Sequence, residues 1–331
     1  MKDNDPIVIV CATDSRYVLP LAVMLRSVAE HLRDDRRVTC YVLYTGVGQG
    51  DRDRVCETLP KGQFDVKWIP ASPQNLRGVP IWGRMPVTTY FKLLVPDLLP
   101  HHVDRAIWLD CDMLVTRDIA LLWNVDLNGH TTAAVQDQLV PLVSSRGGIA
   151  RSADLGISAQ SKYFNAGVML MSLSAWRREG LTRKALGYLR ENARSVMFWD
   201  QEGLNVVLAG KWQELPRSWN VNVSLPGWRR VPRDRAPAIL HFAGMLKPWA
   251  YRTADPEWSV YNQYLDHTAW AGIRPARTAI NSAISLYERS GIRRVTHSLE
   301  GVAMSIARRF SAGPDMQASD TGVAGVPLES Q

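Results

Sequence analysis

Cysteine is scarce in this chain of 331 residues, and its four cysteines all lie in the first third. No two of them have the close spacing of a thiolate metal site or of a redox motif, so neither chemistry is expected. The cysteines are Cys11, Cys40, Cys56 and Cys111. Three of them lie in or beside apolar runs, and we expect buried free thiols there, which indicates a reducing compartment.

Long apolar runs are also missing, because none approaches the roughly 20 residues that span a bilayer. The segment before the first apolar run lacks the basic and apolar regions of a secretory signal. Both absences favour a cytoplasmic protein. The net charge of +7 favours anionic partners such as nucleotides, phosphorylated glycans or acidic lipid headgroups without choosing among them. We expect no nucleic-acid partner.

Apolar segments alternate with helical patterns along most of the chain. Residues 7–11 form a continuous apolar run, which is typical of a strand buried on both faces. A segment with helical spacing follows, and residues 38–44 have the pattern of the next strand, so the chain opens with a right-handed β-α-β unit. Further strands are expected at residues 64–69, 106–109, 131–135, 168–172 and 238–240. The pattern predicts an α/β fold with a doubly wound, mostly parallel sheet.

The chain changes character after this α/β region, which we place at residues 1–270. Residues 271–311 carry apolar side chains at helical spacing among many arginines. Such basic amphipathic helices can lie on an anionic membrane surface, or they can pack on the main domain with their arginines in solvent. Both interpretations stay open. Residues 312–331, rich in Ser, Gly and Ala, are expected to form a disordered tail.

The segment Ile-Trp-Leu-Asp-Cys-Asp at residues 107–112 is an apolar strand that ends in two carboxylates. Side chains alternate across a strand, so Asp110 and Asp112 are expected to point the same way. Two carboxylates so placed can bind one divalent cation. Taken alone, the same tripeptide is common in solvated turns and helix caps.

Four segments in a fixed order give this motif its context. Together they resemble glycosyltransferase family 8, the retaining transferases that use nucleotide-activated galactose or glucose. The pattern is most similar to that of bacterial lipopolysaccharide and lipooligosaccharide galactosyl- and glucosyltransferases. The segments are Asp110-Cys111-Asp112, Tyr163-Phe164-Asn165-Ala166-Gly167, Trp199-Asp200-Gln201 and the run from His241 to Trp249.

The resemblance covers residues 7 to about 251. It implies a sheet of the glycosyltransferase A type with a small C-terminal helical appendage. It also makes residues 1–270 a nucleotide-sugar-binding catalytic domain.

The resemblance implies that Asp110, Asp112 and His241 bind Mn²⁺, with Mg²⁺ as an alternative. Two carboxylates and one imidazole suit Mn²⁺ better than Ca²⁺, which takes oxygen ligands almost exclusively. The strands that precede Asp110 and His241 are expected to end at the same sheet edge. Lys247 and the backbone of Gly244 would then hold the diphosphate of the donor. Taken alone, His241 and Lys247 are more typical of an interior histidine and a surface lysine.

The first strand is expected to deliver the nucleoside pocket through Thr13, Asp14 and Tyr17. The resemblance implies that Asp14 accepts the imide N–H of uracil and that Tyr17 stacks on the base. A helix cap and a core tyrosine are the alternatives. Arg16 stands where the family has a small polar residue, which puts the contact at position 16 in doubt. Cys111, between the two acids, is counted among the donor-binding residues.

The reacting sugar is expected to lie among four other side chains. Lys92 stands where the family has an arginine that touches the donor; it keeps the charge but loses the planar fork, so weaker activity or another donor stays open. Asn165 and Asp200 would bind sugar hydroxyls, and Asp200 would also stabilise positive charge at the reacting carbon. Gln201 stands where a double displacement needs a nucleophile, and an amide is a poor one. We therefore expect same-face substitution, unlike the two-carboxylate mechanism of retaining hydrolases.

We therefore expect a manganese-dependent retaining glycosyltransferase that moves galactose or glucose from a UDP-hexose to a hydroxyl of a glycan or glycolipid acceptor. Its place would be the cytoplasm, with residues 271–311 as a candidate peripheral membrane contact. A phosphatase of the haloacid dehalogenase type also has Asp-x-Asp at a strand end, but Leu114 replaces the Thr or Val expected there. A catalytically silent glycan-binding or scaffold module is the other alternative.

Overall fold

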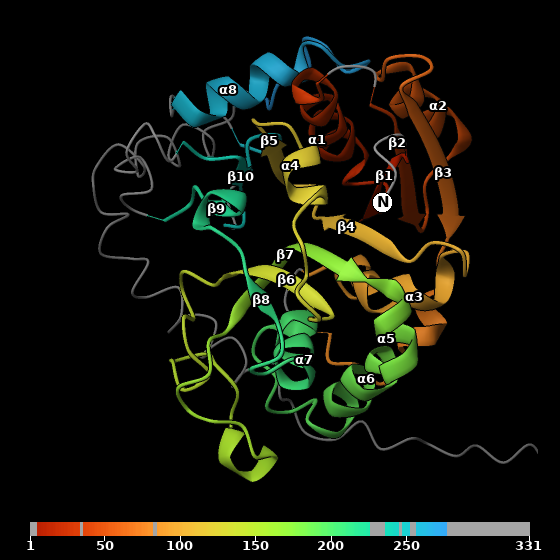
Figure 1. The fold of residues 1–331 in the computed structure, drawn as a ribbon. Helices are drawn as coiled ribbons and strands as arrows, with labels where there is room; N and C mark the ends of the chain where they lie inside the picture. The colour runs from red at the N-terminus through yellow and green to blue at the C-terminus, as the bar shows by residue number, and fades with distance from the viewer. Residues whose placement is uncertain are drawn as a thin grey trace, which may run out of the picture.

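A computed structural model describes residues 5–33, 36–81, 85–225, 236–244, 247–251 and 256–276. In these residues a sheet of seven strands lies beside a sheet of three strands, with helices around both (Figure 1). The strands are β1 Ile7–Thr13, β2 Val38–Tyr44, β3 Phe64–Pro70, β4 Arg105–Leu109, β5 Met113–Val115, β6 Thr132–Gln136, β7 Phe164–Ser172, β8 Gln213–Glu214, β9 Val221–Asn222 and β10 Ile239–His241. The α-helices are α1 Val18–His31, α2 Gln49–Glu57, α3 Val95–Leu98, α4 Ala120–Trp123, α5 Leu173–Glu179, α6 Leu181–Glu191, α7 Trp199–Val207 and α8 Pro256–Leu265. The 3-10 helices are η1 Pro73–Leu76, η2 Val87–Leu94, η3 Ser152–Leu155 and η4 Arg217–Trp219.

The large sheet has the strand order β3-β2-β1-β4-β7-β6-β8. Strands β3, β2, β1 and β4 pair in parallel, whereas β7 is antiparallel to both β4 and β6. The prediction of a doubly wound, mostly parallel α/β sheet is therefore confirmed. The chain winds outward from β1 to β3 and returns on the other side of β1 as β4. Open α/β sheets bind ligands at the carboxyl edge of such a switch point.

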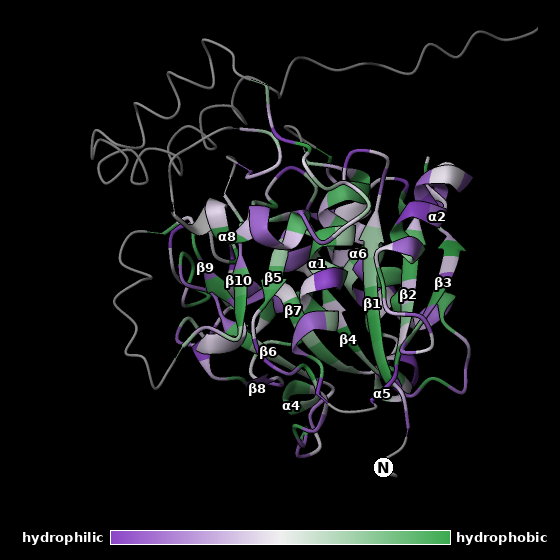
Figure 2. Cartoon of the chain, turned by 90° about the horizontal axis from the view of Figure 1, so that it is seen from above, coloured by the Kyte–Doolittle hydropathy of each residue, from purple (hydrophilic) through white to green (hydrophobic). Residues whose placement is uncertain are grey.

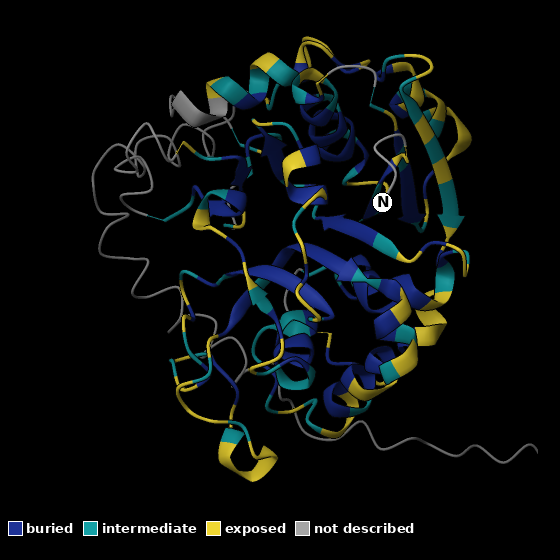
Figure 3. Cartoon of the chain, in the orientation of Figure 1, coloured by how far each residue is buried: buried dark blue, intermediate teal, exposed yellow. Residues whose placement is uncertain are grey.

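The strands of the large sheet are buried on both faces, which explains their continuous apolar runs. Ile9 of β1 packs in one core with Leu21 of α1, and helices α2, α4 and α8 add to that side. Val10 and Trp108 point to the opposite face, into a second core with residues of α5, α6 and α7. Figure 1 shows the two helical layers above and below the sheet, and Figure 3 shows β4, β6 and β7 as buried between them. Figure 2 shows the matching pattern, with hydrophobic strands inside and hydrophilic residues on outer helices such as α2.

The prediction that the strands before Asp110 and His241 end at the same sheet edge is wrong. Strand β4 belongs to the seven-stranded sheet, whereas β10 lies in the small sheet, in the order β5-β10-β9. The chain turns after Asp112 into β5, and β5 pairs antiparallel with β10 so that Met113 faces His241. The Phe242 N–H also donates to the Asp112 carbonyl oxygen over 2.9 Å. His241 therefore reaches the acidic motif through strand pairing in the second sheet.

The expected buried thiols are confirmed, because Cys11, Cys40 and Cys111 are buried and free, while Cys56 is exposed. The predicted regions 271–311 and 312–331 lie outside the described residues, except for residues 271–276. Among the helices that are described, none combines the length and the apolar character needed to cross a bilayer.

Packing between α6 and α7 leaves no space for a side chain at Gly203. A Cβ there would lie 2.8 Å from Cγ and Cδ1 of Leu189, whereas a Cβ at Gly187 of α6 would meet nothing within 4 Å. Alanine at either position gains about 1 kcal/mol of helix propensity, but overpacking at position 203 costs about 1–3 kcal/mol. We expect Gly203→Ala to lower the free energy of unfolding by about 1 kcal/mol and Gly187→Ala to raise it by about 0.5–1 kcal/mol. Urea denaturation measures both, and equal stabilisation by the two variants would contradict this account.

Candidate active site

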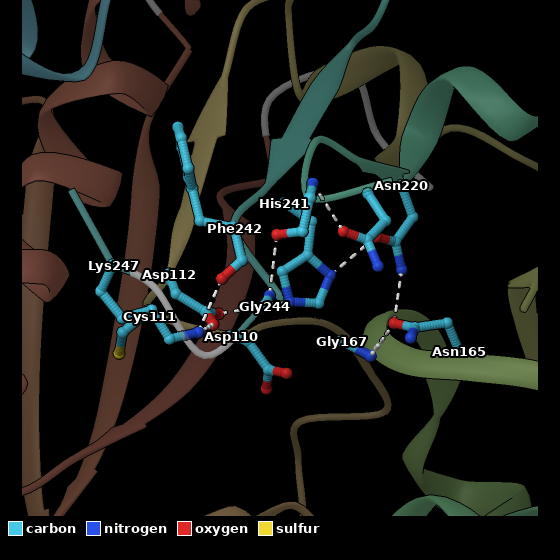
Figure 4. Close-up of polar contacts among 12 residues, drawn as sticks. Asp110, Cys111, Asp112, Asn165, Gly167, Asn220, His241, Phe242, Gly244 and Lys247 are labelled. Carbon is cyan, nitrogen blue, oxygen red and sulfur yellow. Dashed lines mark hydrogen bonds and ion pairs between the residues drawn. The ribbon is translucent and has the colours of Figure 1, made fainter. Parts of the chain in front are cut away.

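Asp110, Asp112 and His241 form a cluster at the carboxyl ends of β4 and β10 (Figure 4). Each offers one ligand atom, and the three atoms lie within 4.8 Å of one another. The two carboxylates converge as expected, but they lie in the turn between β4 and β5, so alternation along a strand is not the reason. Carboxylate oxygens with one imidazole nitrogen form a donor set that suits Mn²⁺ or a similar divalent ion. The residues present thus fit the cation that the sequence pattern implies.

Asp112 is a buried anion that two basic side chains stabilise. The ammonium of Lys247 lies 2.6 Å from Oδ2 of Asp112, and Nε2 of His241 lies 3.3 Å from Oδ1. Burial opposes the charge of Asp112, but Lys247 and His241 outweigh it and hold the pKa of Asp112 well below its usual range. Lys247 also donates to the carbonyl oxygen of Phe242 over 2.6 Å. The predicted diphosphate ligand Lys247 thus lies directly at the acidic cluster.

Two glycines let the site close tightly around His241. A Cβ at Gly167 of β7 would lie 2.6 Å from Cε1 of His241 and 2.8 Å from Cε of Met113, so only glycine fits there. A Cβ at Gly244 would lie 2.5 Å from Oγ of Ser224, and the Gly244 N–H donates to that oxygen over 2.9 Å. The Gly244 amide, predicted to hold the diphosphate, therefore bonds Ser224 in this structure.

Lys92 of η2 connects the acidic cluster with Asp200. Its side chain is only 3% exposed, and its ammonium lies 2.8 Å from Oδ2 of Asp200 and 3.3 Å from Oδ1 of Asp110. It also donates to the carbonyl oxygen of Ala166 over 3.2 Å. Burial opposes the charge of Lys92, but the carboxylates of Asp110 and then Asp200 outweigh it and raise the pKa of Lys92.

Asp200 lies in the first turn of α7 and is also buried. Burial raises the pKa of Asp200 to about 6, although Lys92 pulls it in the opposite direction. The residue before it, Trp199, has a φ of +43°, a left-handed conformation that is strained for a large side chain. The Glu202 carboxylate stabilises this turn by accepting the Met197 N–H over 2.6 Å. The strain thus lies directly beside a candidate catalytic carboxylate.

Asn165 and Gln201 are held by Asp137, a residue that the sequence analysis missed. Oδ2 of Asp137 accepts from Nδ2 of Asn165 over 2.9 Å and from Nε2 of Gln201 over 3.2 Å. Oε1 of Gln201 accepts the Ala166 N–H over 3.1 Å, so both ends of its amide are bonded to the protein. Asp137 follows β6 directly, as Asp110 follows β4, and this strand-end position was the signal that could have identified it.

His241 is connected to Asn165 through Asn220, a second residue that the sequence analysis missed. Oδ1 of Asn220 lies 2.9 Å from Nδ1 of His241, and Nδ2 of Asn220 donates to Oδ1 of Asn165 over 2.8 Å. Figure 4 shows His241 between the acidic pair on one side and Asn220 on the other. Asn220 precedes β9 in a loop with no recognisable motif, and no signal in the sequence points to it.

The predicted nucleoside residues lie together at the end of β1. Arg16 pairs with Asp14: its Nη2 lies 2.7 Å from Oδ2, and its backbone N–H donates to Oδ1 over 2.9 Å. The Tyr17 ring packs edge-on against Trp249, with ring centroids 5.5 Å apart. Thr13 is buried, with its hydroxyl donating to the Asp14 carbonyl oxygen over 3.1 Å. Arg16, which stands where the family has a small polar residue, is thus the direct partner of Asp14.

Cys111 joins this first strand to the acidic motif. Its thiol donates to the carbonyl oxygen of Ala12 over 3.0 Å, which connects the segment between the two acids to the end of β1. The structure therefore brings the predicted residues from β1, β4, β7, α7 and β10 to one region, with Lys92 and Lys247 as the cations among them.

The comparisons with known proteins agree with this arrangement. A sequence model described as glycosyl transferase family 8 matches residues 8–253. General stress protein A of Bacillus subtilis is 28% identical and covers 82% of this chain and 96% of its own length. Lipopolysaccharide 1,2-glucosyltransferase of Escherichia coli is 25% identical and covers 79% of this chain and 78% of its own length.

Among solved structures, the galactosyltransferase LgtC in complex with donor and acceptor sugar analogs is similar in fold. Its TM-score is 0.67 at 24% identity, with 84% of this chain and 99% of that chain covered. An active-site mutant of LgtC gives a TM-score of 0.69 at 24% identity, with 83% and 98% covered. The fold is thus that of the glycosyltransferase A type.

The ion pair between Lys92 and Asp200 is expected to be important for stability because both side chains are buried. Lys92→Met leaves a buried carboxylate without its cation and is expected to lower the free energy of unfolding by about 3–5 kcal/mol. Adding Asp200→Asn should recover part of that loss, with a coupling energy of about 1–3 kcal/mol. Urea denaturation of the four proteins of this double-mutant cycle gives the coupling.

The half-exposed pair of Lys162 and Glu214 is the matched control. The corresponding cycle, Lys162→Met with Glu214→Gln, is expected to give a coupling of at most about 1 kcal/mol, because solvent screens an exposed pair. A coupling at Lys92 no larger than this would show that burial does not strengthen the inner pair.

Proposed function

This chain belongs to glycosyltransferase family 8, and we propose that it transfers galactose or glucose from a UDP-hexose to a hydroxyl of a glycan or glycolipid, with Mn²⁺ at Asp110, Asp112 and His241. As a member of the family it is a retaining hexosyltransferase. The observation that carries the proposal is the convergence of these three side chains beside two lysines, the buried Lys92 and the partly buried Lys247. Membership in this family also sets aside the phosphatase alternative.

Asp110, Asp112 and His241 would hold a divalent cation, which would supply neutralisation of the charge on the departing nucleoside diphosphate. Asp110 and Asp112 would supply carboxylate oxygens, and His241 would supply Nε2. The ammonium of Lys247 lies on Oδ2 of Asp112 and is close enough to exchange this partner for a phosphate oxygen. Such a move costs little free energy, because only the torsions of the flexible lysine side chain change.

The hydrogen bonds of Gln201 support same-face substitution. Its amide oxygen accepts a backbone N–H and its nitrogen donates to Asp137, so neither atom is directed at a substrate as a nucleophile. The acceptor hydroxyl would attack while the diphosphate leaves from the same face, and the proton would pass to the leaving phosphate. In this scheme Gln201 and Asn165 shape the sugar pocket.

Asp200 would stabilise positive charge at the reacting carbon. A buried carboxylate acts strongly on such charge because little water screens it. Lys92 holds Asp200 in place through the 2.8 Å ion pair. Trp199, which has the strained left-handed conformation, directly precedes Asp200 at the start of α7.

The nucleoside would bind at the Asp14–Arg16 pair. Uracil presents an N–H donor flanked by carbonyl acceptors. Asp14 can accept from that N–H, and the exposed guanidinium of Arg16 has further N–H groups for a carbonyl. Tyr17 and Trp249 supply aromatic surface beside it.

The acceptor is proposed to be a surface glycan or glycolipid at the cytoplasmic face of the membrane. The proposal is supported by two relatives, the lipopolysaccharide 1,2-glucosyltransferase of E. coli and the lipopolysaccharide 1,3-galactosyltransferase of Salmonella typhimurium. We keep residues 1–270 as the catalytic domain, residues 271–311 as the candidate membrane contact and residues 312–331 as a tail.

Donor turnover tests the proposal directly. Incubation with UDP-galactose and UDP-glucose in the presence of Mn²⁺ should release UDP, and a chelator should abolish the release. We expect Asp110→Ala and Asp112→Ala to lower turnover by about 10³-fold, since a metal ion supplies several kcal/mol of charge stabilisation. Coupled detection of UDP, with mass spectrometry of the transferred sugar, measures both donor and rate.

The exposed carboxylate of Asp53 on α2 is the matched control. Asp53→Ala should leave turnover unchanged. Full activity in Asp110→Ala and Asp112→Ala would refute the metal site. Binding of UDP-hexose without any release of UDP would indicate a silent glycan-binding module instead.

The raised pKa of Asp200 predicts an acidic limit to activity. Below about pH 6 the carboxyl becomes protonated and loses the negative charge that stabilises the reacting carbon. At saturating donor and Mn²⁺, turnover should therefore fall roughly tenfold for each unit of pH below that value. A pH–rate profile of UDP release measures this.

Lys92 lowers the pKa of Asp200, so Lys92→Met should move the acidic limit to higher pH. Lys92→Arg keeps the positive charge and should leave the limit close to that of the unchanged protein. An identical profile in Lys92→Met would show that the limit belongs to another group.

A further inference from the structure

A single line of side-chain hydrogen bonds joins Asp137 to the imidazole of His241. Nδ2 of Asn165 donates to Oδ2 of Asp137 over 2.9 Å, and Nδ2 of Asn220 donates to Oδ1 of Asn165 over 2.8 Å. Oδ1 of Asn220 then lies 2.9 Å from Nδ1 of His241. Asn220 and His241 are 1% and 4% exposed, so water cannot easily replace these partners.

The donor and acceptor of each hydrogen bond in this line are determined by groups at its ends that can only donate or only accept. Oδ1 of Asp137 accepts the backbone N–H groups of Leu139 and Val140, each over 2.8 Å, so the carboxylate has only acceptors to offer Asn165. The Gly167 N–H donates to Oδ1 of Asn165 over 3.0 Å, and a backbone N–H can only donate. The amide of Asn165 is therefore fixed from both ends.

A fixed Asn165 fixes Asn220 in turn. Because Oδ1 of Asn165 is an acceptor, Asn220 must turn its NH₂ group toward it and its own oxygen toward His241. A carbonyl oxygen accepts, so Nδ1 of His241 carries the hydrogen when the ring is neutral. The lone pair of Nε2 then faces Oδ1 of Asp112, 3.3 Å away, where a cation would bind.

The opposite tautomer has a competing attraction. Asp112 is an acceptor on the Nε2 side, so without Asn220 the ring would gain by placing its hydrogen on Nε2. That hydrogen would occupy the position that a metal ligand has to leave free. The two sides of the ring thus compete, and the shorter contact lies on the side of Asn220.

We propose that Asn220 is a positioning residue that holds His241 in the Nδ1–H tautomer and so keeps Nε2 free for a divalent cation. The inference rests on the proposed metal site. It adds that the donor and acceptor directions set by Asp137 and Gly167 pass through two side-chain amides to the metal ligand. These amides belong to Asn165 and Asn220. Partners of this kind typically contribute 10- to 100-fold in metal affinity.

Two substitutions at one position test the proposal. Asn220→Leu removes the acceptor, and we expect the neutral His241 ring of the metal-free protein to change to Nε2–H and the Kd for Mn²⁺ to rise about 10- to 100-fold. Asn220→Asp keeps an acceptor at Nδ1, so the tautomer should be retained, but its second oxygen cannot donate to Oδ1 of Asn165 and part of the affinity should be lost. Nitrogen NMR of the histidine ring, assigned by its loss in His241→Ala, reports the tautomer, and electron paramagnetic resonance of free Mn²⁺ reports the Kd.

Asn192→Leu, which removes an amide hydrogen bond at the end of α6, is the control for general loss of polar contacts and should change neither readout. If the leucine at position 220 prevents folding, Asn220→Ala removes the same acceptor with less bulk. An Nδ1–H ring and an unchanged Kd in the apolar variant would overturn the proposal, as would equal loss of affinity in Asn220→Asp and Asn220→Leu. Failure of the unchanged protein to bind Mn²⁺ would refute the metal site, whereas the tautomer readout would still decide the role of Asn220.

Discussion

Repulsion among three neighbouring carboxylates is the constraint around which this active site is built. Asp200 is buried, whereas the side chains of Asp112 and Asp110 are 13% and 29% exposed. Two lysines offset the repulsion from opposite sides, Lys92 from below the large sheet and Lys247 from the loop after β10. In the proposed mechanism, the same negative potential that lowers stability would attract a divalent cation and stabilise positive charge at a sugar carbon. Stability and chemistry therefore depend on the same charges.

The connection between the two sheets brings these groups together. The chain delivers Asp110 at the end of β4, turns through Cys111 and Asp112, and continues at once as β5 of the small sheet. Pairing of β5 with β10 then fixes His241 beside the turn in a register set by backbone hydrogen bonds. A ligand contributed by a strand is held more rigidly than one contributed by a free loop. Three candidate ligands are thus placed by one turn and one strand pair.

Local pattern was sufficient for six of the seven strands of the large sheet, but not for the two-residue strand β8 or for the relation between the sheets. The apolar runs of β1, β2 and β4 could be recognised because both faces of these strands are buried. Asp110 and Asp112, by contrast, converge in the turn between β4 and β5, which strand alternation does not predict. The three-residue strands β5 and β10 are too short to show any periodicity, so the origin of the contact with His241 could not be foreseen. Asp137 could have been found from its strand end. Asn220 could not, because its importance depends on partners far apart in the chain.

Lys92 fits its surroundings well, although it lacks the planar guanidinium of the arginine that the family has at this position. Its ammonium has three N–H donors, and three acceptors surround it: Oδ2 of Asp200, Oδ1 of Asp110 and the carbonyl oxygen of Ala166. These acceptors come from three different elements, which suits a compact tetrahedral ammonium, whereas a guanidinium presents its donors in one plane. The Trp108 ring lies 5.4 Å from the ammonium and adds a further favourable contact. The departure from the family arginine therefore coincides with a pocket in which the Lys92 ammonium forms ion pairs with two carboxylates and one hydrogen bond with a carbonyl oxygen.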